Sequence, residues 1–154
     1  MSFHLSLSAD RVTAAYPKDP LVVSPDAMVG TVLQLLRANR SGSVLVCEDN
    51  QLRGIFTERD ALRWMASGQS NEVPIESLMS QELETLGEDA SVADAIRLMS
   101  QGGYRRLPIM SSDGIPTGVA SVRGIIQYLV DHFPQAIYTL PPQPNSVTSE
   151  REGA

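Results

Sequence analysis

The chain has 154 residues, enough for one domain or two very small ones, and a chain of this length buries roughly 70% of its unfolded surface on folding. Its hydrophobic fraction of 42% is ordinary for a globular protein, and no apolar run approaches the roughly 20 residues needed to cross a bilayer. The net charge of −6 argues against a duplex nucleic-acid surface, which needs clustered lysine and arginine. We therefore expect no nucleic-acid or membrane partner.

Cysteine and histidine usage argues against disulfide and metal chemistry. Cys47 is the only cysteine, so no disulfide can form within the chain, and a reducing cytoplasm is the expected location. It lies in the apolar run 44–47, which favours buried packing over a redox or nucleophilic role. His4 and His132 have no metal-ligand spacing with each other or with Cys47, so we expect no metal site. Residues 1–10 do not resemble a secretory signal.

Residues 1–18 carry little pattern, and we predict a strand or short helix that packs late. After an apolar stretch at 21–23, Ser24-Pro25-Asp26 has the residues of a helix start: a capping hydroxyl, a proline and an acidic group. Apolar residues then recur at the spacing of one helical face, and the helix is expected to end near Gly42. That face consists of Val29, Val32, Leu33 and Leu36.

Two strands and a second helix complete the first unit. The apolar run 44–47 predicts a buried strand, residues 48–51 a turn, and residues 52–56 a returning strand. A helix is then expected from about Arg59 to Ala66, and residues 68–71 close the unit.

The same order of elements repeats later in the chain. Asp89 lies 63 residues after Asp26, and Ser121 lies 64 residues after Thr57, so one turn residue has been inserted. The second unit has a helix ending at Gly102-Gly103 and is predicted to continue with two strands and a final helix. The helical faces comprise Val92, Ala95, Ile96 and Met99, then Ile125, Ile126, Leu129, Val130 and Phe133, and the strands are 107–110 and 117–120. Each unit is too small to bury its sheet alone, so the two must share a core.

A short motif after each returning strand carries the most specific signal. It reads Gly54-Ile55-Phe56-Thr57-Glu58-Arg59-Asp60 in the first unit and Gly118-Val119-Ala120-Ser121-Val122-Arg123-Gly124 in the second. Together with segments 75–79, 93–99 and 103–108, this duplicated pattern resembles the tandem module of the cystathionine-β-synthase-type (CBS) family. The resemblance covers roughly Asp19 to Pro134.

The resemblance implies an α+β fold in which two β-α-β-β-α repeats, 19–70 and 71–134, pack sheet against sheet about a pseudo-twofold axis. The N-terminal segment 1–18 precedes them, and a mobile Pro-rich tail, 135–154, follows, of which 137–140 could dock on the body. The family commonly binds adenosine compounds in two clefts between the repeats and often forms homodimers. The candidate ligands are AMP, ADP, ATP and S-adenosylmethionine, with no further cofactor required.

Thr57 and Asp60 are the central candidate ligand-binding residues. Asp60 offers two carboxylate oxygens to ribose hydroxyls, and Thr57 offers a hydroxyl at a helix N-terminus to a phosphate or ribose oxygen. The same spacing is close to a capping box, in which both side chains only satisfy backbone donors. Spacing alone favours capping, whereas the family pattern favours ligand contact by Asp60, and Thr57 can serve both roles.

The second repeat is expected to supply the other half of this site. The resemblance implies that Arg105 and Arg106 reach toward Thr57 and bind phosphate, for which guanidinium groups are well suited; the alternative is a solvated pair or a bridge to carboxylates. Thr85 matches the family position that approaches adenine or ribose, or else it is an ordinary strand threonine. Ile55 completes the set, and Arg123 is a further candidate phosphate ligand.

The pseudo-symmetric cleft has lost these groups. Gly124 has no carboxylate, Val22 has no hydroxyl where Thr85 has one, and Gly42-Ser43 replaces the arginine pair. We therefore predict that the second cleft, which would use these residues and Ser121, binds no ribonucleotide or binds it only weakly.

Catalysis finds little support in the sequence. The chain lacks a nucleophile elbow, a P-loop and a G-x-G-x-x-G loop, and we expect no catalytic residues and no enzyme activity. The expected function is a regulatory module that binds one adenosine nucleotide per chain and signals to an unidentified partner protein by a conformational shift. The alternative is a ligand-free scaffold for dimerisation.

Overall fold

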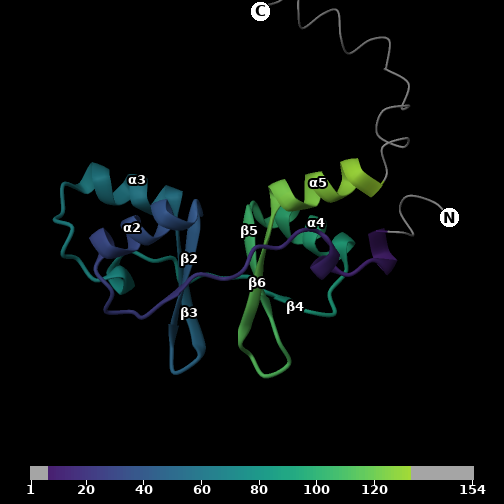
Figure 1. Cartoon of the computed structure of the whole chain (residues 1–154), viewed down its shortest axis with the longest axis horizontal. Helices are drawn as coiled ribbons and strands as arrows, with labels where there is room; N and C mark the ends of the chain where they lie inside the picture. The colour runs from purple at the N-terminus through teal and green to yellow at the C-terminus, as the bar shows by residue number, and fades with distance from the viewer. Residues whose placement is uncertain (1–6, 133–154) are drawn as a thin grey trace, which may run out of the picture.

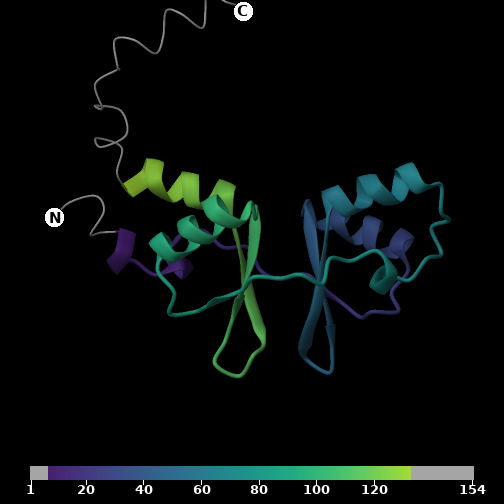
Figure 2. The ribbon, with the colours of Figure 1, turned by 180° about the vertical axis from the view of Figure 1, so that it is seen from behind.

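The computed structural model describes residues 7–132, which form two lobes of similar shape side by side (Figure 1). In each lobe a three-stranded sheet faces the other lobe, and two helices cover its outer side, as the reverse view also shows (Figure 2). This arrangement confirms the predicted α+β fold of two repeats. Each helix in this range is too short or too polar to span a lipid bilayer. Phe133, the tail 135–154 and its docking stretch 137–140 lie outside the described residues.

Both lobes have the predicted order of strand, helix, strand, strand and helix. The first lobe comprises β1 (Val22–Val23), α2 (Val29–Asn39), β2 (Ser43–Glu48), β3 (Gln51–Thr57) and α3 (Glu58–Ser67). The second comprises β4 (Leu86–Gly87), α4 (Val92–Gly102), β5 (Arg106–Met110), β6 (Pro116–Ser121) and α5 (Val122–His132). In each sheet the first strand is parallel to the second, and the second is antiparallel to the third.

The position of strand β2 between the two lobes explains why its sequence is continuously apolar. Side chains alternate between the faces of a strand, so Val44 and Val46 pack into the core of their own lobe while Leu45 points to the other lobe. Leu45 forms a cluster between the sheets with Ile55 of β3 and Val119 of β6. Because both faces of β2 are covered, both must be apolar. The two lobes therefore share this small cluster, but each lobe also has a larger core of its own, so the prediction of a shared core holds only in part.

Helix α2 begins later than predicted. Ser24-Pro25-Asp26 was expected to start it, but the helix starts at Val29, and the Ser24 carbonyl instead accepts a hydrogen bond from the N–H of Ala27 and closes a turn. The N–H of Val29 donates to the carbonyl of Val73, 2.9 Å away. A distant segment thus satisfies the helix start, which removes the need for a local capping side chain.

The described part of the N-terminal segment, residues 7–18, has a defined place in the fold, although its sequence shows little pattern. It contains a 3₁₀ helix, η1 (Val12–Ala14), and it packs on the second lobe. The N–H of Val12 donates to the carbonyl of Ala90 at 2.8 Å, and Lys18 exchanges two backbone hydrogen bonds with Val119. Val12 is fully buried, so this segment is part of the core of the second lobe.

The linker between the repeats packs on the first lobe in the equivalent way. It contains η2 (Ile75–Ser77), whose first N–H donates to the carbonyl of Ala27 at 2.7 Å. Ser80 exchanges two backbone hydrogen bonds with Ile55, as Lys18 does with Val119. Each lobe is therefore completed by a segment that precedes the other lobe's strands, and the chain crosses between the lobes (Figure 1, Figure 2).

Candidate functional site

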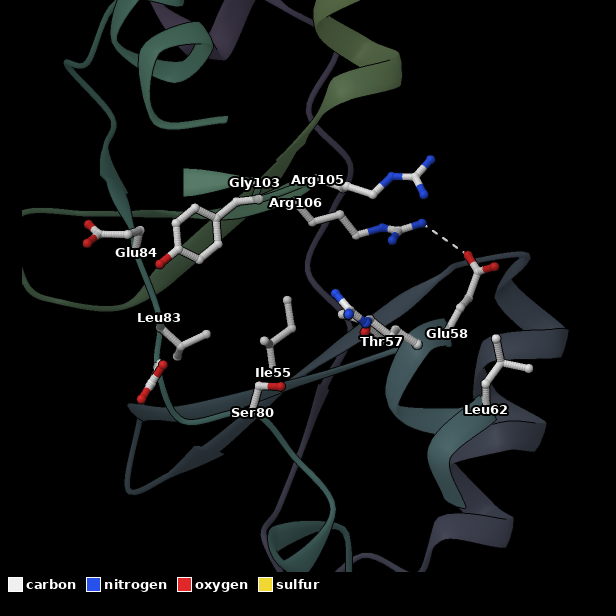
Figure 3. A pocket seen from close by; sticks show the side chains of 13 residues that line it. Ile55, Thr57, Glu58, Leu62, Ser80, Leu83, Glu84, Gly103, Arg105 and Arg106 are labelled. Atoms are coloured by element: carbon white, nitrogen blue, oxygen red, sulfur yellow. Dashed lines mark hydrogen bonds and ion pairs between the residues drawn. The ribbon is translucent and has the colours of Figure 1, made fainter. Parts of the chain in front are cut away.

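A cleft of about 600 Å³ lies between the two lobes; we call it the first cleft (Figure 3). Three segments line it: the β3–α3 junction of the first lobe, the linker at 80–84, and residues 103–106 before and at the start of β5. Of the residues predicted from the sequence, the structure brings four to this cleft. These are Ile55, Thr57, Arg105 and Arg106.

The first cleft has a basic end beside the helix start. Figure 3 shows the guanidinium groups of Arg105 and Arg106 on the side of Glu58, with Glu84 at the opposite end. Arg106 Nη2 lies 3.1 Å from Glu58 Oε1, so the predicted alternative of a bridge to a carboxylate applies to this arginine. Arg105 forms no ion pair with any residue in the described range. It is therefore available to an anionic group in the cleft.

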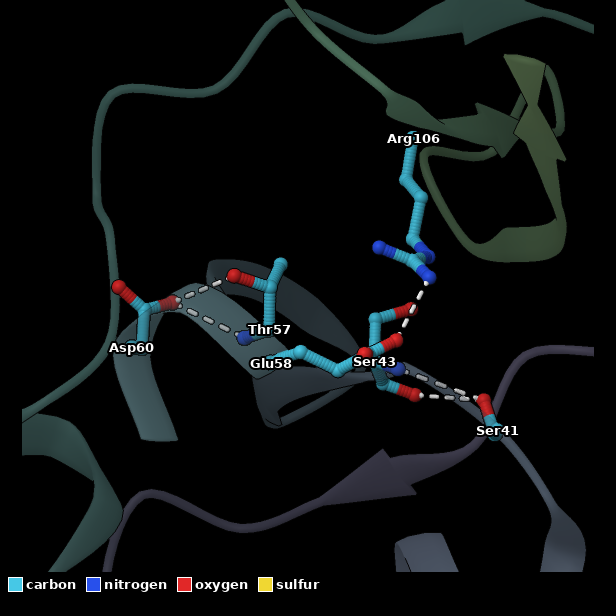
Figure 4. Close-up of polar contacts among 6 residues, drawn as sticks. All are labelled: Ser41, Ser43, Thr57, Glu58, Asp60 and Arg106. Atoms are coloured by element: carbon cyan, nitrogen blue, oxygen red, sulfur yellow. Dashed lines mark hydrogen bonds and ion pairs between the residues drawn. The ribbon is translucent and has the colours of Figure 1, made fainter. Parts of the chain in front are cut away.

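Asp60 does not line the first cleft but lies directly behind it. Its carboxylate is only 5% exposed, and Oδ2 accepts hydrogen bonds from the N–H of Thr57 at 2.9 Å and its hydroxyl at 3.2 Å (Figure 4). Oδ1 accepts from the hydroxyl of Ser80 at 3.2 Å. Thr57 and Ser80 both line the cleft, so Asp60 fixes two of its walls. The capping role considered from the spacing is present, and contact with a ribose stays a prediction.

Two predicted site residues lie elsewhere. Thr85 is exposed and precedes β4 without lining the cleft, although its neighbour Glu84 does line it. Arg123, in the first turn of α5, lines the second cleft instead of the first. Sequence reasoning missed Tyr104, which adjoins the arginine pair and offers an aromatic face. Its position inside the segment 103–108 was the signal that could have identified it.

The second cleft, of about 360 Å³, includes Gly42, Ser43 and Ser121 as predicted, but neither Val22 nor Gly124 lines it. Gly124 shows why no carboxylate occupies the position equivalent to Asp60. A Cβ atom on Gly124 would lie 2.7 Å from the carbonyl oxygen of Ala15, in the N-terminal segment. Since a backbone carbonyl cannot rotate away, a side chain at this position requires the segment to move.

Cys47 is half-buried near the cluster between the sheets, and burial raises the pKa of its thiol above the ordinary value. A raised pKa lowers the thiolate fraction and hence the reactivity. Across residues 7–132, no group of three or more histidine, cysteine, aspartate or glutamate side chains is arranged to hold a metal ion.

Comparison with known proteins identifies the family of both lobes. The family model described as CBS domain matches residues 14–67 and 75–131. An uncharacterized 17.7 kDa protein of Acidianus ambivalens is 32% identical over 111 residues, which cover 71% of this chain and 67% of that protein.

Two solved structures share the fold. A CBS domain protein from Pyrobaculum aerophilum complexed with AMP has a TM-score of 0.69 at 21% identity, covering 79% of this chain and 98% of that one. The CBS domain pair of protein MJ0100, in complex with 5-methylthioadenosine and S-adenosyl-L-methionine, has a TM-score of 0.69 at 19% identity, covering 76% and 97%. With one family match in each lobe, the chain belongs to the CBS-domain family as a tandem pair.

Proposed function

We propose that this chain is a regulatory module that binds one adenosine nucleotide in the first cleft. The observation that supports the proposal most directly is that Arg105 and Arg106 of the second lobe and Thr57 of the first line one cleft. The structural relatives with AMP, 5-methylthioadenosine and S-adenosylmethionine support an adenosine compound as the ligand. AMP, ADP, ATP and S-adenosylmethionine are the candidates.

The lining of the first cleft offers suitable groups to each part of such a ligand. Arg105 and Arg106 present planar, paired donors to phosphate oxygens, and Thr57 adds a hydroxyl at the positive end of the α3 dipole. Ile55 and Tyr104 provide apolar surface for the adenine ring. Asp60 either exchanges its present hydrogen bonds for ribose hydroxyls or holds Thr57 in place for them.

A ligand in this cleft can signal because both lobes contact it. A nucleotide that binds one angle between the lobes more tightly than another shifts the population toward that angle, and a partner protein can read the shift. The proposal requires no catalytic residue, metal or additional cofactor, and it places the protein in the cytoplasm, where its lone cysteine stays reduced.

The proposal also includes a homodimer through α3 and α5, which lie along the same edge of the molecule (Figure 1). Leu62 and Met65 of α3 are each 65% exposed, and Ile126 of α5 is 55% exposed. Leu62 and Ile126 occupy equivalent positions in the two repeats, so a second copy can cover both with one twofold contact. Leu62→Asp should convert a dimer into a monomer in analytical ultracentrifugation, and a wild-type monomer at high concentration would contradict the dimer.

Calorimetric titration with AMP, ADP, ATP and S-adenosylmethionine tests the nucleotide proposal. Binding of one ligand per chain is expected, and mass spectrometry of the purified protein can identify a ligand that co-purifies. No heat from any of the four at millimolar concentration would contradict the proposal. The alternative, a ligand-free dimerisation scaffold, is favoured by the capping hydrogen bonds of Asp60. It predicts that nucleotide leaves the melting temperature unchanged, whereas a bound ligand at 100 times its Kd stabilises by about 2.7 kcal/mol.

A further inference from the structure

The second cleft concentrates positive charge in a chain whose net charge is −6. Lys18, Arg40 and Arg123 line it, and none of the three forms an ion pair with a residue between 7 and 132. Arg106 lines it as well and is paired with Glu58. Asp19 and Glu58 are the two acidic residues in the lining, so cationic residues outnumber acidic ones by four to two.

These cationic groups converge from four separate segments. Lys18 comes from the N-terminal segment, Arg40 from the end of α2, Arg106 from the start of β5 and Arg123 from the first turn of α5. A solvated charge run would lie along one element and spread its charges into water. Like charges brought to one concavity from both lobes repel each other, and an anion between them would relieve that repulsion.

Arg40 occupies a backbone conformation that disfavours any side chain. Its φ of 50° and ψ of 42° are left-handed, and its N–H closes the end of α2 by donating to the carbonyl of Arg37. Glycine is the usual residue at such a helix end because it adopts this conformation without strain. The arginine at this position therefore places a cationic side chain beside the cleft despite that strain.

A serine hydroxyl completes the set. Ser43, at the start of β2, is only 6% exposed, and its backbone N–H and carbonyl both bond to the hydroxyl of Ser41. The Ser43 Oγ has no hydrogen-bond partner in the described part of the chain, and the residue lies beside the Glu58–Arg106 contact (Figure 4). Ser43 lines the cleft, and its hydroxyl is not fully buried, so it is placed to donate to a bound oxygen.

The same cleft is poorly suited to a nucleoside. Its volume is about 360 Å³ against about 600 Å³ for the first cleft, and its lining holds no aromatic residue. We infer that the second cleft binds a small multivalent oxyanion of the phosphate type, held by Lys18, Arg40, Arg123 and the Ser43 hydroxyl. The inference goes beyond the proposed function and does not depend on nucleotide binding in the first cleft.

Calorimetric titration of the full chain with inorganic phosphate and with pyrophosphate tests the inference, at ionic strength held constant with chloride. Saturable binding of one pyrophosphate per chain is expected. Arg40→Gly and Arg123→Gln should each weaken it at least tenfold, and Ser43→Ala a few-fold. Arg40→Gly removes the cation while relieving the left-handed backbone, so this variant should fold. Arg53→Gln is the matched control, because Arg53 pairs with Glu48 away from both clefts.

Three outcomes would overturn the inference. One is an absence of heat with both anions at millimolar concentration. Another is an equal loss of affinity in Arg53→Gln, which would indicate diffuse attraction. The third is a loss of pyrophosphate affinity in Arg105→Gln while Arg40→Gly and Arg123→Gln keep the wild-type affinity. That result would assign the anion to the first cleft. AMP titration of Arg123→Gln separates this test from the nucleotide proposal, because Arg123 does not line the first cleft and AMP affinity should be unchanged.

Discussion

The two helices that follow the repeated motif, α3 and α5, begin in equivalent ways but meet different neighbours. The N–H of Glu58 donates to the carbonyl of Gly42, and the N–H of Val122 donates to the carbonyl of Arg105. The backbone hydrogen bonds are therefore the same in both repeats even though the side chains differ. Gly42 of the first repeat corresponds to Arg105 of the second. Arg105 and Arg106 both line the first cleft, whereas only Arg106 of the two lines the second.

The segments that dock on each lobe account for the difference between Asp60 and Gly124. In the first lobe the linker brings the Ser80 hydroxyl to the Asp60 carboxylate. In the second lobe the N-terminal segment brings the carbonyl of Ala15 against Gly124. A carboxylate fits the first position and is excluded from the second. The asymmetry of the clefts thus depends on the docking segments as much as on the repeats.

The largest effect is expected from Gly124→Ala, which tests the close approach of the N-terminal segment. The added Cβ would lie 2.7 Å from a backbone oxygen, and overpacking of this kind typically costs about 1–3 kcal/mol. Chemical denaturation should show that decrease in the free energy of unfolding, with nucleotide affinity unchanged. Gly118→Ala is the matched control, because its Cβ would meet neighbours at 3.5 Å or more. Equal stability of the two variants would contradict the proposed packing.

Asp60→Ala tests the equivalent position in the first lobe. We expect at least a tenfold loss of nucleotide affinity, equivalent to about 1.4 kcal/mol, because the variant removes either a ribose acceptor or the support of Thr57 and Ser80. Calorimetry measures the affinity, and denaturation measures the accompanying loss of stability. Asp94→Ala is the control, because Asp94 caps α4 in a similar way without lining either cleft. Unchanged affinity in Asp60→Ala would favour the ligand-free scaffold.

Much of the fold could be predicted because its signals are local. The spacing of Val29, Val32 and Leu36 gave the face of α2, and the continuous apolar run of β2 gave a strand covered on both sides. The start of α2 could not be predicted, because the carbonyl that satisfies Val29 belongs to Val73, which is distant in the sequence. Residues 10–18 were expected to pack, but where they dock could not be predicted because it depends on contacts with the second lobe.

The candidate site could be predicted only in part. Thr57, Arg105 and Arg106 line the first cleft because the repeat pattern fixes which turns face each other. The spacing of Thr57 and Asp60 fits both capping and ligand contact, so the sequence alone could not choose between them. Arg123 was associated with the first cleft because its distance from Thr57 cannot be judged from the sequence. It belongs to α5, whose first turn borders the second cleft.

A smaller effect is expected from Glu58→Gln, which changes the contact that both clefts share. Glu58 and Arg106 line the first and the second cleft, and their ion pair is partly exposed. Such pairs contribute about 0.2–1 kcal/mol, so releasing Arg106 should raise nucleotide affinity up to about fivefold. Titration at low and high salt should show the gain shrinking as salt screens the charges. Glu48→Gln, which breaks a pair away from the clefts, should give no gain.

The smallest effect is expected at the start of α4, which is capped differently from the start of α2. Helix α2 has Met28 at its N-cap with no capping hydrogen bond, whereas Ser91 and Asp94 form a capping box at α4. The hydrogen bond from the backbone N–H of Ser91 lowers the pKa of the Asp94 carboxyl below its ordinary value. A lowered pKa in the folded state means that ionised Asp94 stabilises the fold above the unfolded pKa of roughly 4, and that this contribution is lost as the pH falls through the folded pKa.

Asp94→Asn should therefore be less stable than the wild type at pH 7, by at most about 1 kcal/mol because the carboxylate is nearly half exposed. The difference should shrink as the pH falls below roughly 4, where the wild-type carboxyl also becomes neutral. Denaturation midpoints measured from pH 7 to pH 3 give the comparison. A difference that stays constant over this range would show that the charge of Asp94 does not act through the helix start.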